Sequence, residues 1–496
     1  MATNSISLYQ QPSQREPLAG AYMWLMLFMV VYCARPQEWI PKIGAYIPMG
    51  KVTGILAFLA LTFAAGKIRQ RLPREVIYLG LLIVQLWLTV PMSSVWRGGA
   101  FDNVLEFSKV LPIVIVISLA VRTATRLRRI LLLQCMSVAI ISSYALWKGH
   151  SSAGRLGLEG IVGGNYANPN DLAFSIVMTL PLCLVFFLKT RNMLMKVFWL
   201  AAMPVMMYAM LLTGSRGGVV CLLVAAALCL WEFGVRGRRH HLLLVVPVAA
   251  IVFWAYAGGV VKGRFQSTFQ NTDDQAYSSA QERWHLLVRS VEVTAEHPVF
   301  GVGPGNFVVV SGFWRMSHNS FTQMSSEGGL PGFVLFVMLL WCGFKNIKLA
   351  KQSTKDKETA LLASGLQASL LAFVVGSFFD AAAYQLFTYF LVAYTTALCQ
   401  ITLRQEESGA RLTESLSPAT VQEDIVKNPV RGRADLQWNG RSPAVLASEH
   451  HSNGTVQIGK YVRESVSLPA KRVGEDPGGR IRSVRSSVAP GQPGTR

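Results

Sequence analysis

Long apolar blocks recur along this chain of 496 residues, and they constrain its fold more than any other feature. Each block has roughly 20 residues, which is enough for a helix to cross the ~30 Å hydrocarbon core of a bilayer. Only 15% of the residues are charged, whereas a soluble protein of this length carries about 25%. We therefore predict an all-α polytopic membrane protein.

Twelve spans are predicted, with a helical outer loop between the ninth and the tenth. The spans cover residues 19–34, 47–66, 76–95, 104–121, 130–147, 171–188, 193–212, 217–234, 241–259, 328–344, 359–379 and 384–402. Lys and Arg collect in cytoplasmic loops. With the N-terminus inside, the five inner loops carry 4, 4, 3, 3 and 5 of these residues, and the short outer loops carry 2, 1, 2, 1 and none. This alternation predicts that both termini are cytoplasmic.

The domain organisation follows from the same blocks. We expect N-terminal spans over 1–150, a core over 151–345 that contains the outer loop 260–327, C-terminal spans over 346–403 and a tail over 404–496. The tail is rich in Ser, Gly, Pro, Arg and Glu, so we expect it to be disordered and cytoplasmic. Within the loop, "AYSSAQERWHLLVRSVEVTAEHPVFG" predicts an amphipathic helix, and "GVGPGN" predicts a turn rather than a nucleotide site.

The net charge of +20 does not by itself indicate a nucleic acid partner. Much of it comes from Lys and Arg residues in the predicted cytoplasmic loops, where they set the orientation of the spans. No cleavable signal peptide is apparent, and we expect none. The seven cysteines lie within or beside spans without metal-ligand spacing, so neither a disulfide framework nor a metal site is expected. Glu106 and Lys109 are three residues apart in one span, which favours an inward-facing ion pair over a substrate path.

Polar residues that are able to carry chemistry gather on the predicted outer face. Arg216, in "TGSRGG", lies between two spans at the membrane boundary, where a guanidinium offers paired donors to a phosphate. A plain interfacial arginine is an equally good interpretation. Arg283 lies on the amphipathic helix, where a solvated helix face is the better interpretation from the residues alone.

His318, Asn319 and Glu327 stand directly before the tenth span. The ordinary pKa of histidine, about 6.5, suits a general base at neutral pH. Glu327 is nine residues further on, so it shares a face with His318 only if the chain bends, which Gly328 and Gly329 permit. Structural interpretations remain open for both: a hydrogen-bonded histidine and a carboxylate at a helix N-terminus.

Four motifs occur in one order: "YANPNDLA", "LLTGSRGGVV", "HPVFGVGPGNF" and "HNSFTQMSSEGGLPG". In this they resemble the O-antigen ligase family and its relatives, the O-antigen polymerases and bacterial protein O-oligosaccharyltransferases. The resemblance is densest over about 165–340. It implies a helical membrane glycosyltransferase in the bacterial inner membrane, with a periplasmic cap, that acts in lipopolysaccharide biosynthesis. The donor would be an undecaprenyl-diphosphate-linked glycan and the acceptor a lipid A-core sugar, another glycan or a protein.

The same resemblance implies roles for individual residues. Arg216 and Arg283 would bind the carrier diphosphate and neutralise charge on the leaving group. His318 would act as general base, with Glu327 orienting it or the acceptor. The site would be shaped by Asn168, Asp171 and Asn319. Metal ligands are not clustered, so a metal-independent mechanism without a cofactor is expected.

Two other classes of protein stay open. A polar-lipid or glycan transporter would place substrate charges near the midplane, where only Lys51, Glu106 and Lys109 qualify. A scaffold would depend on its basic tail. Among the enzymes, the shared motifs do not separate ligase from polymerase or protein transferase.

Overall fold

The computed structural model describes residues 18–39, 48–66, 72–152, 155–158, 166–243 and 274–415. The elements are, in chain order, α1 (Ala19–Cys33), α2 (Pro36–Trp39), α3 (Met49–Ala65), α4 (Arg74–Met92), α5 (Arg97–Ser108), α6 (Val110–Ala120), α7 (Ala124–Lys148), β1 (His150–Ser152), β2 (Arg155–Gly157), α8 (Pro169–Lys189), α9 (Met193–Leu212), α10 (Arg216–Cys229), the π-helix η2 (Leu230–Val235), α13 (Asp274–Glu296), α14 (Phe307–Val310), α15 (Ser320–Ser353), α16 (Lys357–Gly376) and α17 (Leu386–Ser415).

The polytopic all-α architecture is confirmed. Within the described residues, nine helices are long and apolar enough to cross a membrane, and α1 and α3 are shorter apolar helices. The predicted ninth span, 241–259, lies almost entirely outside the described part of the chain, so the count of twelve stays a prediction. One small departure is the antiparallel hairpin of β1 and β2, which pairs His150 with Gly157.

Two further expectations need correction. Residues 404–415, predicted to begin the disordered tail, continue α17 as helix, and 416–496 lie outside the described residues. Glu106 and Lys109 do form their ion pair, but their side chains are 67% and 39% exposed rather than turned inward. Helix spacing brings the two together, whereas packing around them leaves the pair on the outside.

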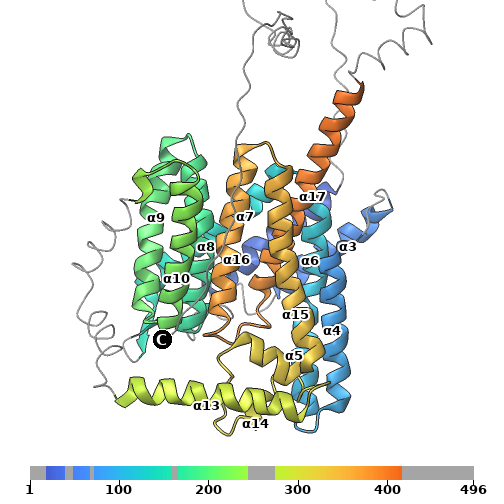
Figure 1. Cartoon of the computed structure of the whole chain (residues 1–496), viewed down its shortest axis with the longest axis vertical. Coiled ribbons are helices and arrows are strands. Elements are labelled where there is room, and N and C mark those ends of the chain that lie inside the picture. The colour runs from blue at the N-terminus through green and yellow to red at the C-terminus, as the bar shows by residue number, and fades with distance from the viewer. Residues whose placement is uncertain are drawn as a thin grey trace, which may run out of the picture. The chain divides into compact units, whose positions relative to one another are not determined.

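The helical unit 19–414 is a bundle in which α16 is central (Figure 1). Helix α16 packs against α8, α10 and α15, while α15 packs against α4. Its buried positions are mainly small and apolar, and Gly365 and Gly376 leave no room for a Cβ beside Val185 and Phe174. This close approach brings the ends of α10, α15 and α16 together at one end of the bundle.

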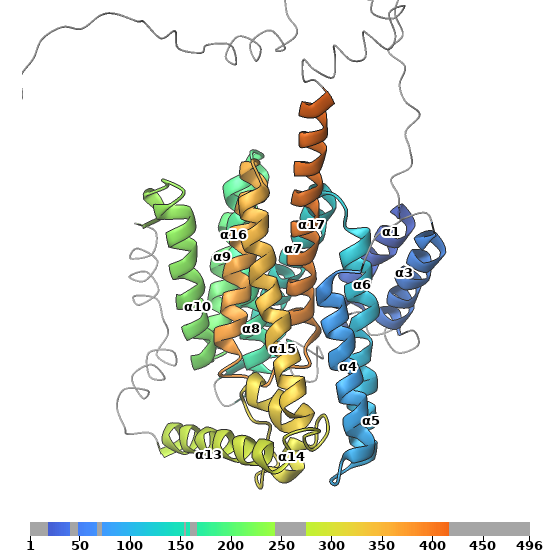
Figure 2. The same ribbon diagram turned by 45° about the vertical axis from the view of Figure 1, so that its right-hand side comes forward.

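Helix α13 crosses that end of the bundle nearly at right angles to the long helices (Figures 1 and 2). The predicted amphipathic helix is thereby confirmed. One face is buried through Leu286 and Val293, which pack with Val302 and Phe307 in a small separate core. Trp284 on another face is 64% exposed. Helix α13 therefore lies across the start of α15 and packs against it.

Helix α15 is broken at Gly329, whose φ of 71° and ψ of 177° are open essentially to glycine alone. The break deprives carbonyl groups of the preceding turn of their helical partners, and Pro331 has no N–H to offer. Replacement donors come from the "GVGPGN" turn and from α4. The carbonyl groups of Ser326 and Glu327 accept from the N–H groups of Val302 and Gly303, at 2.9 and 3.0 Å.

The remaining groups at the break are satisfied in the same way. The Gln85 side-chain amide on α4 donates to the carbonyl oxygens of Gly328, at 3.1 Å, and Val299, at 2.8 Å. The Leu330 N–H donates to the Pro298 carbonyl at 2.7 Å. Unsatisfied backbone groups are costly near a bilayer. The break therefore needs the 298–303 segment, and the two fold as one unit.

We expect Gly329→Ala to destabilise the protein strongly. A Cβ at this position would lie 2.2 Å from the Val299 carbonyl oxygen, in addition to the strain of positive φ. Gly312→Ala is the matched control, because Gly312 has a φ of 78° but no atom within 4 Å of a Cβ. The free energy of unfolding should fall by about 1 kcal/mol in the control. In Gly329→Ala it should fall by roughly 3 kcal/mol or more.

Thermal unfolding in detergent, followed by size-exclusion chromatography, measures the difference. Equal losses for the two variants would contradict the tight contact between Gly329 and the 298–303 segment.

Candidate functional site

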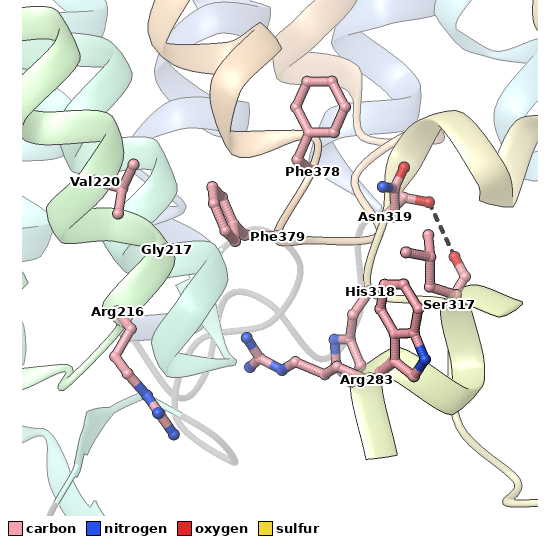
Figure 3. A pocket seen from close by; sticks show the side chains of 11 residues that line it. Arg216, Gly217, Val220, Arg283, Ser317, His318, Asn319, Phe378 and Phe379 are labelled. Carbon is pink, nitrogen blue, oxygen red and sulfur yellow. Dashed lines mark hydrogen bonds between the residues drawn. The ribbon is translucent and has the colours of Figure 1, made fainter. Parts of the chain in front are cut away.

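A pocket of about 350 Å³ opens where α10, α13, the start of α15 and the end of α16 meet (Figure 3). Four chain segments that are distant in sequence line it. Its lining residues are Arg216, Gly217, Val220, Arg283, Trp284, Leu287, Ser317, His318, Asn319, Phe378 and Phe379. Four of the predicted site residues, Arg216, Arg283, His318 and Asn319, are therefore brought together.

Arg216 is the first residue of α10, so its side chain and the N-terminus of this helix face the pocket together. Ser215 caps the helix by accepting the Gly218 N–H at 3.3 Å. The free N–H groups of a first turn carry partial positive charge. An exposed guanidinium beside a helix N-terminus is a suitable arrangement for an anion.

Phe379 packs directly on the first turn of α10. A Cβ at Gly217 would lie only 2.7 Å from the Phe379 Cβ, so glycine is needed for this close approach. Phe378 and Phe379 form an apolar wall that the sequence analysis missed. Their "FFD" stretch at the end of an apolar block was read as part of a span, and its position at the outer end is the signal that was available.

Arg283 reaches the pocket from α13, and Figure 3 shows its side chain extending toward the α10 side. Burial lowers the pKa of this guanidinium, and the positive charge of Arg216 lowers it further. Arginine nevertheless stays protonated at neutral pH. Two like charges are thus held near one another, with the Asp380 carboxylate acting in the opposite direction on Arg283.

His318 lies at the bend just before α15, with a φ of 51°, which is uncommon for a residue other than glycine. The bend is fixed on both sides. The Ser317 hydroxyl donates to the Asn319 carbonyl at 2.9 Å, and the Asn319 side chain caps α15 by accepting from the N–H groups of Phe321 and Thr322. Asn319 therefore holds the backbone that presents the imidazole.

Burial, more than the nearby charges, favours the neutral form of His318. Burial, with smaller effects of Arg283 and Arg315, lowers the pKa of His318 to about 4. Its Nδ1 is buried and accepts no hydrogen bond from the described residues. A neutral imidazole with a free ring nitrogen can accept a proton.

The hydroxyl group of Ser320 connects the histidine segment to the loop after α16. It donates to the Asp380 carbonyl at 2.7 Å and accepts the Ala382 N–H at 2.9 Å. The Ser320 N–H also donates to the Ser377 carbonyl at 2.7 Å. These bonds fix His318 relative to Phe378 and Phe379, which lie in the same loop.

Glu327 lies apart from the pocket. It is 2% exposed, and its Oε1 accepts the Phe307 N–H at 3.4 Å. Its Oε2 has no hydrogen-bond partner among the described residues. Glu327 precedes the break at Gly329, and its carboxylate faces the 303–307 turn. The structure gives no hydrogen bond between Glu327 and His318.

Asn168 and Asp171 belong to the first turn of α8 and do not line the pocket. Asn168 caps that helix by accepting the Asn170 N–H at 2.9 Å. Asp171 accepts a hydrogen bond of 2.8 Å from the Gln385 side chain, beyond the Phe378–Phe379 loop. Burial, followed by the Asp171 carboxylate, raises the pKa of Asp380 in that loop. Asp171 thus supports the loop that carries Phe378 and Phe379, whereas Asn168 only caps α8.

Arg155 is not among the predicted site residues, but it lies close to the start of α10. Its Nε donates to the Thr213 carbonyl at 2.8 Å, in the turn that leads to α10. Its Nη2 donates to the Asn170 side chain. Arg155 therefore links the first turn of α8 to the turn before Arg216. A long-range contact of this kind has no local sequence signal.

One comparison, with protein-family models, agrees with the motifs. Residues 201–337, which include all the arginine and histidine residues of the pocket, match the family described as O-antigen ligase. No curated protein matches this chain. One solved structure has the description "Structural coordination of polymerization and crosslinking by a peptidoglycan synthase complex". A chain of that structure is 15% identical to this one, with a TM-score of 0.38, and the match covers 66% of this chain and 96% of that chain. Residues 201–337 of this chain are therefore similar to the O-antigen ligase family, in agreement with the motifs.

Proposed function

We propose that this protein transfers a glycan from an undecaprenyl diphosphate carrier to an acceptor hydroxyl on the periplasmic face of the inner membrane, as an O-antigen ligase. The observation that carries the proposal is one pocket lined by two arginines, a helix N-terminus and a neutral histidine. The description of the matched family supports a ligase. Lipid A-core is the acceptor that this function requires.

The donor diphosphate would bind between α10 and α13. Arg216 and Arg283 offer paired N–H donors from opposite sides, and the first turn of α10 adds its partial charge. When the bond between the anomeric carbon and the diphosphate oxygen breaks, the electron pair stays on that oxygen. The positive groups then stabilise the negative charge that grows on this oxygen in the transition state. Electrostatic stabilisation of this kind usually makes the largest contribution to lowering the activation free energy.

His318 would take the proton of the acceptor hydroxyl as its oxygen attacks the anomeric carbon. The base must be neutral before the reaction, and the low pKa of His318 ensures this. A bound diphosphate would offset the charge of Arg283, which makes the imidazole a stronger base when the donor is in place. Donor binding and base activation are thereby coupled.

The apolar part of the pocket suits a lipid-linked donor. Val220, Trp284, Leu287, Phe378 and Phe379 flank the polar groups, and Phe378 and Trp284 are exposed. A diphosphate attached to a polyprenyl chain presents a charged group directly beside an apolar one. Glu327 would act by holding the 303–307 turn under α13 rather than by touching the histidine.

Substitutions of the pocket residues test these roles. We expect Arg216→Ala, Arg283→Ala and His318→Ala each to lower transfer from the lipid-linked donor roughly 100-fold or more. Arg289→Ala is the matched control, because Arg289 lies on the same helix as Arg283 but pairs with Glu292 and Glu296 outside the pocket. Transfer by purified protein in detergent, with folding checked by thermal unfolding, gives the measurement. Full activity of His318→Ala would remove the base from the proposal.

The pH dependence provides a second test. Since the free base persists down to its pKa of about 4, kcat/KM should stay level from about pH 7 to about pH 5 and fall only below that. Arg315→Gln removes one of the positive charges that lower this pKa, and Arg315 does not line the pocket. The acid limb of this variant should therefore move to higher pH. An acid limb near pH 6.5 in the wild type would contradict the argument.

Deletion of the gene in its native host tests the class of reaction. Loss of long surface glycans, with polymer accumulating on the undecaprenyl carrier, is the expected result for a ligase. Single repeat units on the surface would indicate a polymerase, and unchanged glycan pools would favour a transporter. Wild type should complement the deletion, whereas His318→Ala should not.

A further inference from the structure

A second pocket lies at the opposite end of the bundle from the histidine, between α4, α15 and α17. It encloses about 520 Å³. It lies at the basic end of the helices, which the charge pattern predicts to be cytoplasmic. Its lining combines two cations, a carboxylate, amides and aromatic groups: Arg74, Glu75, Tyr78, Trp341, Lys345 and Asn346 are the residues used below.

The floor of this pocket is acidic and poor in donors. Glu75 is 6% exposed, and its Oε1 accepts a hydrogen bond of 2.8 Å from the Asn346 side-chain amide. The same amide group donates to Thr396 at 3.3 Å. In the described part of the chain, Glu75 Oε2 and Asn346 Oδ1 receive no hydrogen bond, and no cation pairs with Glu75. A largely buried carboxylate without a cation is unfavourable.

The rim is basic. Arg74 and Lys345 are exposed, line the pocket and form no ion pair with any described residue. Trp341 beside them is 71% exposed and lies near the end of the predicted span 328–344, and tryptophan at a membrane boundary prefers the headgroup level of a bilayer. The pocket therefore presents acceptors below, unpaired cations above and an aromatic group at the mouth.

We propose that this pocket binds a phospholipid headgroup that carries both a phosphate and a primary ammonium, as in phosphatidylethanolamine. The ammonium would lie on the floor and donate to Glu75 and Asn346, while the phosphate would lie between Arg74 and Lys345. A purely anionic headgroup would pair only with the cations of the rim, and the Glu75 carboxylate on the floor would repel it. A trimethylated ammonium has no N–H for the floor. The inference is independent of the glycosyl-transfer reaction at the other end of the bundle.

Lipid binding to the purified full chain tests the proposal. Native mass spectrometry would compare phosphatidylethanolamine, phosphatidylcholine and phosphatidylglycerol with identical acyl chains. We expect the wild type to retain phosphatidylethanolamine roughly tenfold better than either other lipid, the size expected for charge-assisted hydrogen bonds. Stronger retention of phosphatidylglycerol would overturn the proposal in favour of a simple anion site, and equal retention of all three would overturn it outright.

Variants separate the two halves of the headgroup. Glu75→Gln keeps the shape of the floor and should lose the preference for the ammonium lipid, leaving phosphatidylcholine binding unchanged. Arg74→Gln and Lys345→Gln should weaken all three lipids. Lys196→Gln, in an exposed lysine of α9 at the same end of the bundle, is the matched control and should change nothing. An equal loss in this control would show general charge attraction and contradict a built site.

Discussion

The break in α15 at Gly329 is the constraint on which the outer end of the molecule depends. A helix that breaks at a membrane boundary must find other donors for its freed carbonyl groups. Here the donors belong to Val302, Gly303 and Gln85. The 298–303 segment is thus held against α15, and α13, which directly precedes that segment, is held across the end of the bundle. From that position Arg283 reaches the pocket.

The pocket is strongly positive, which suits it to bind an anion. Two guanidinium groups and a helix N-terminus concentrate positive charge, and the charge of Arg216 lowers the pKa of Arg283. These like charges repel one another, and a bound anion would reduce that repulsion. Burial, with smaller effects of Arg283 and Arg315, keeps His318 neutral. In the proposed reaction, one arrangement would prepare an anion site and a base together. A bound diphosphate would offset the positive charge at the anion site and would strengthen the base.

Much of this was accessible from sequence, because its signals are local. Apolar blocks, the amphipathic period of α13 and the glycine-rich turn all depend on neighbouring residues. The residues Arg216, Arg283, His318 and Asn319 were assigned to the site through the resemblance of their motifs to a known family, and the structure places them in one pocket.

What failed to follow from sequence depends on contacts between distant segments. Glu327 was expected near His318, but its carboxylate accepts the N–H of Phe307, twenty residues earlier, and this contact has no local sequence signal. Phe378 and Phe379 looked like the end of a span until α10 was seen packed against them. The extent of α17 beyond residue 403 likewise escaped a reading based on apolar length.

The most direct test of the central claim is an experimental structure with undecaprenyl diphosphate bound, obtained by cryo-electron microscopy in a lipid nanodisc. We expect the diphosphate between the guanidinium groups of Arg216 and Arg283, with the His318 imidazole facing the position of the transferred sugar. A diphosphate bound elsewhere on the protein, or one that contacts neither arginine, would contradict the assignment of this pocket as the catalytic site.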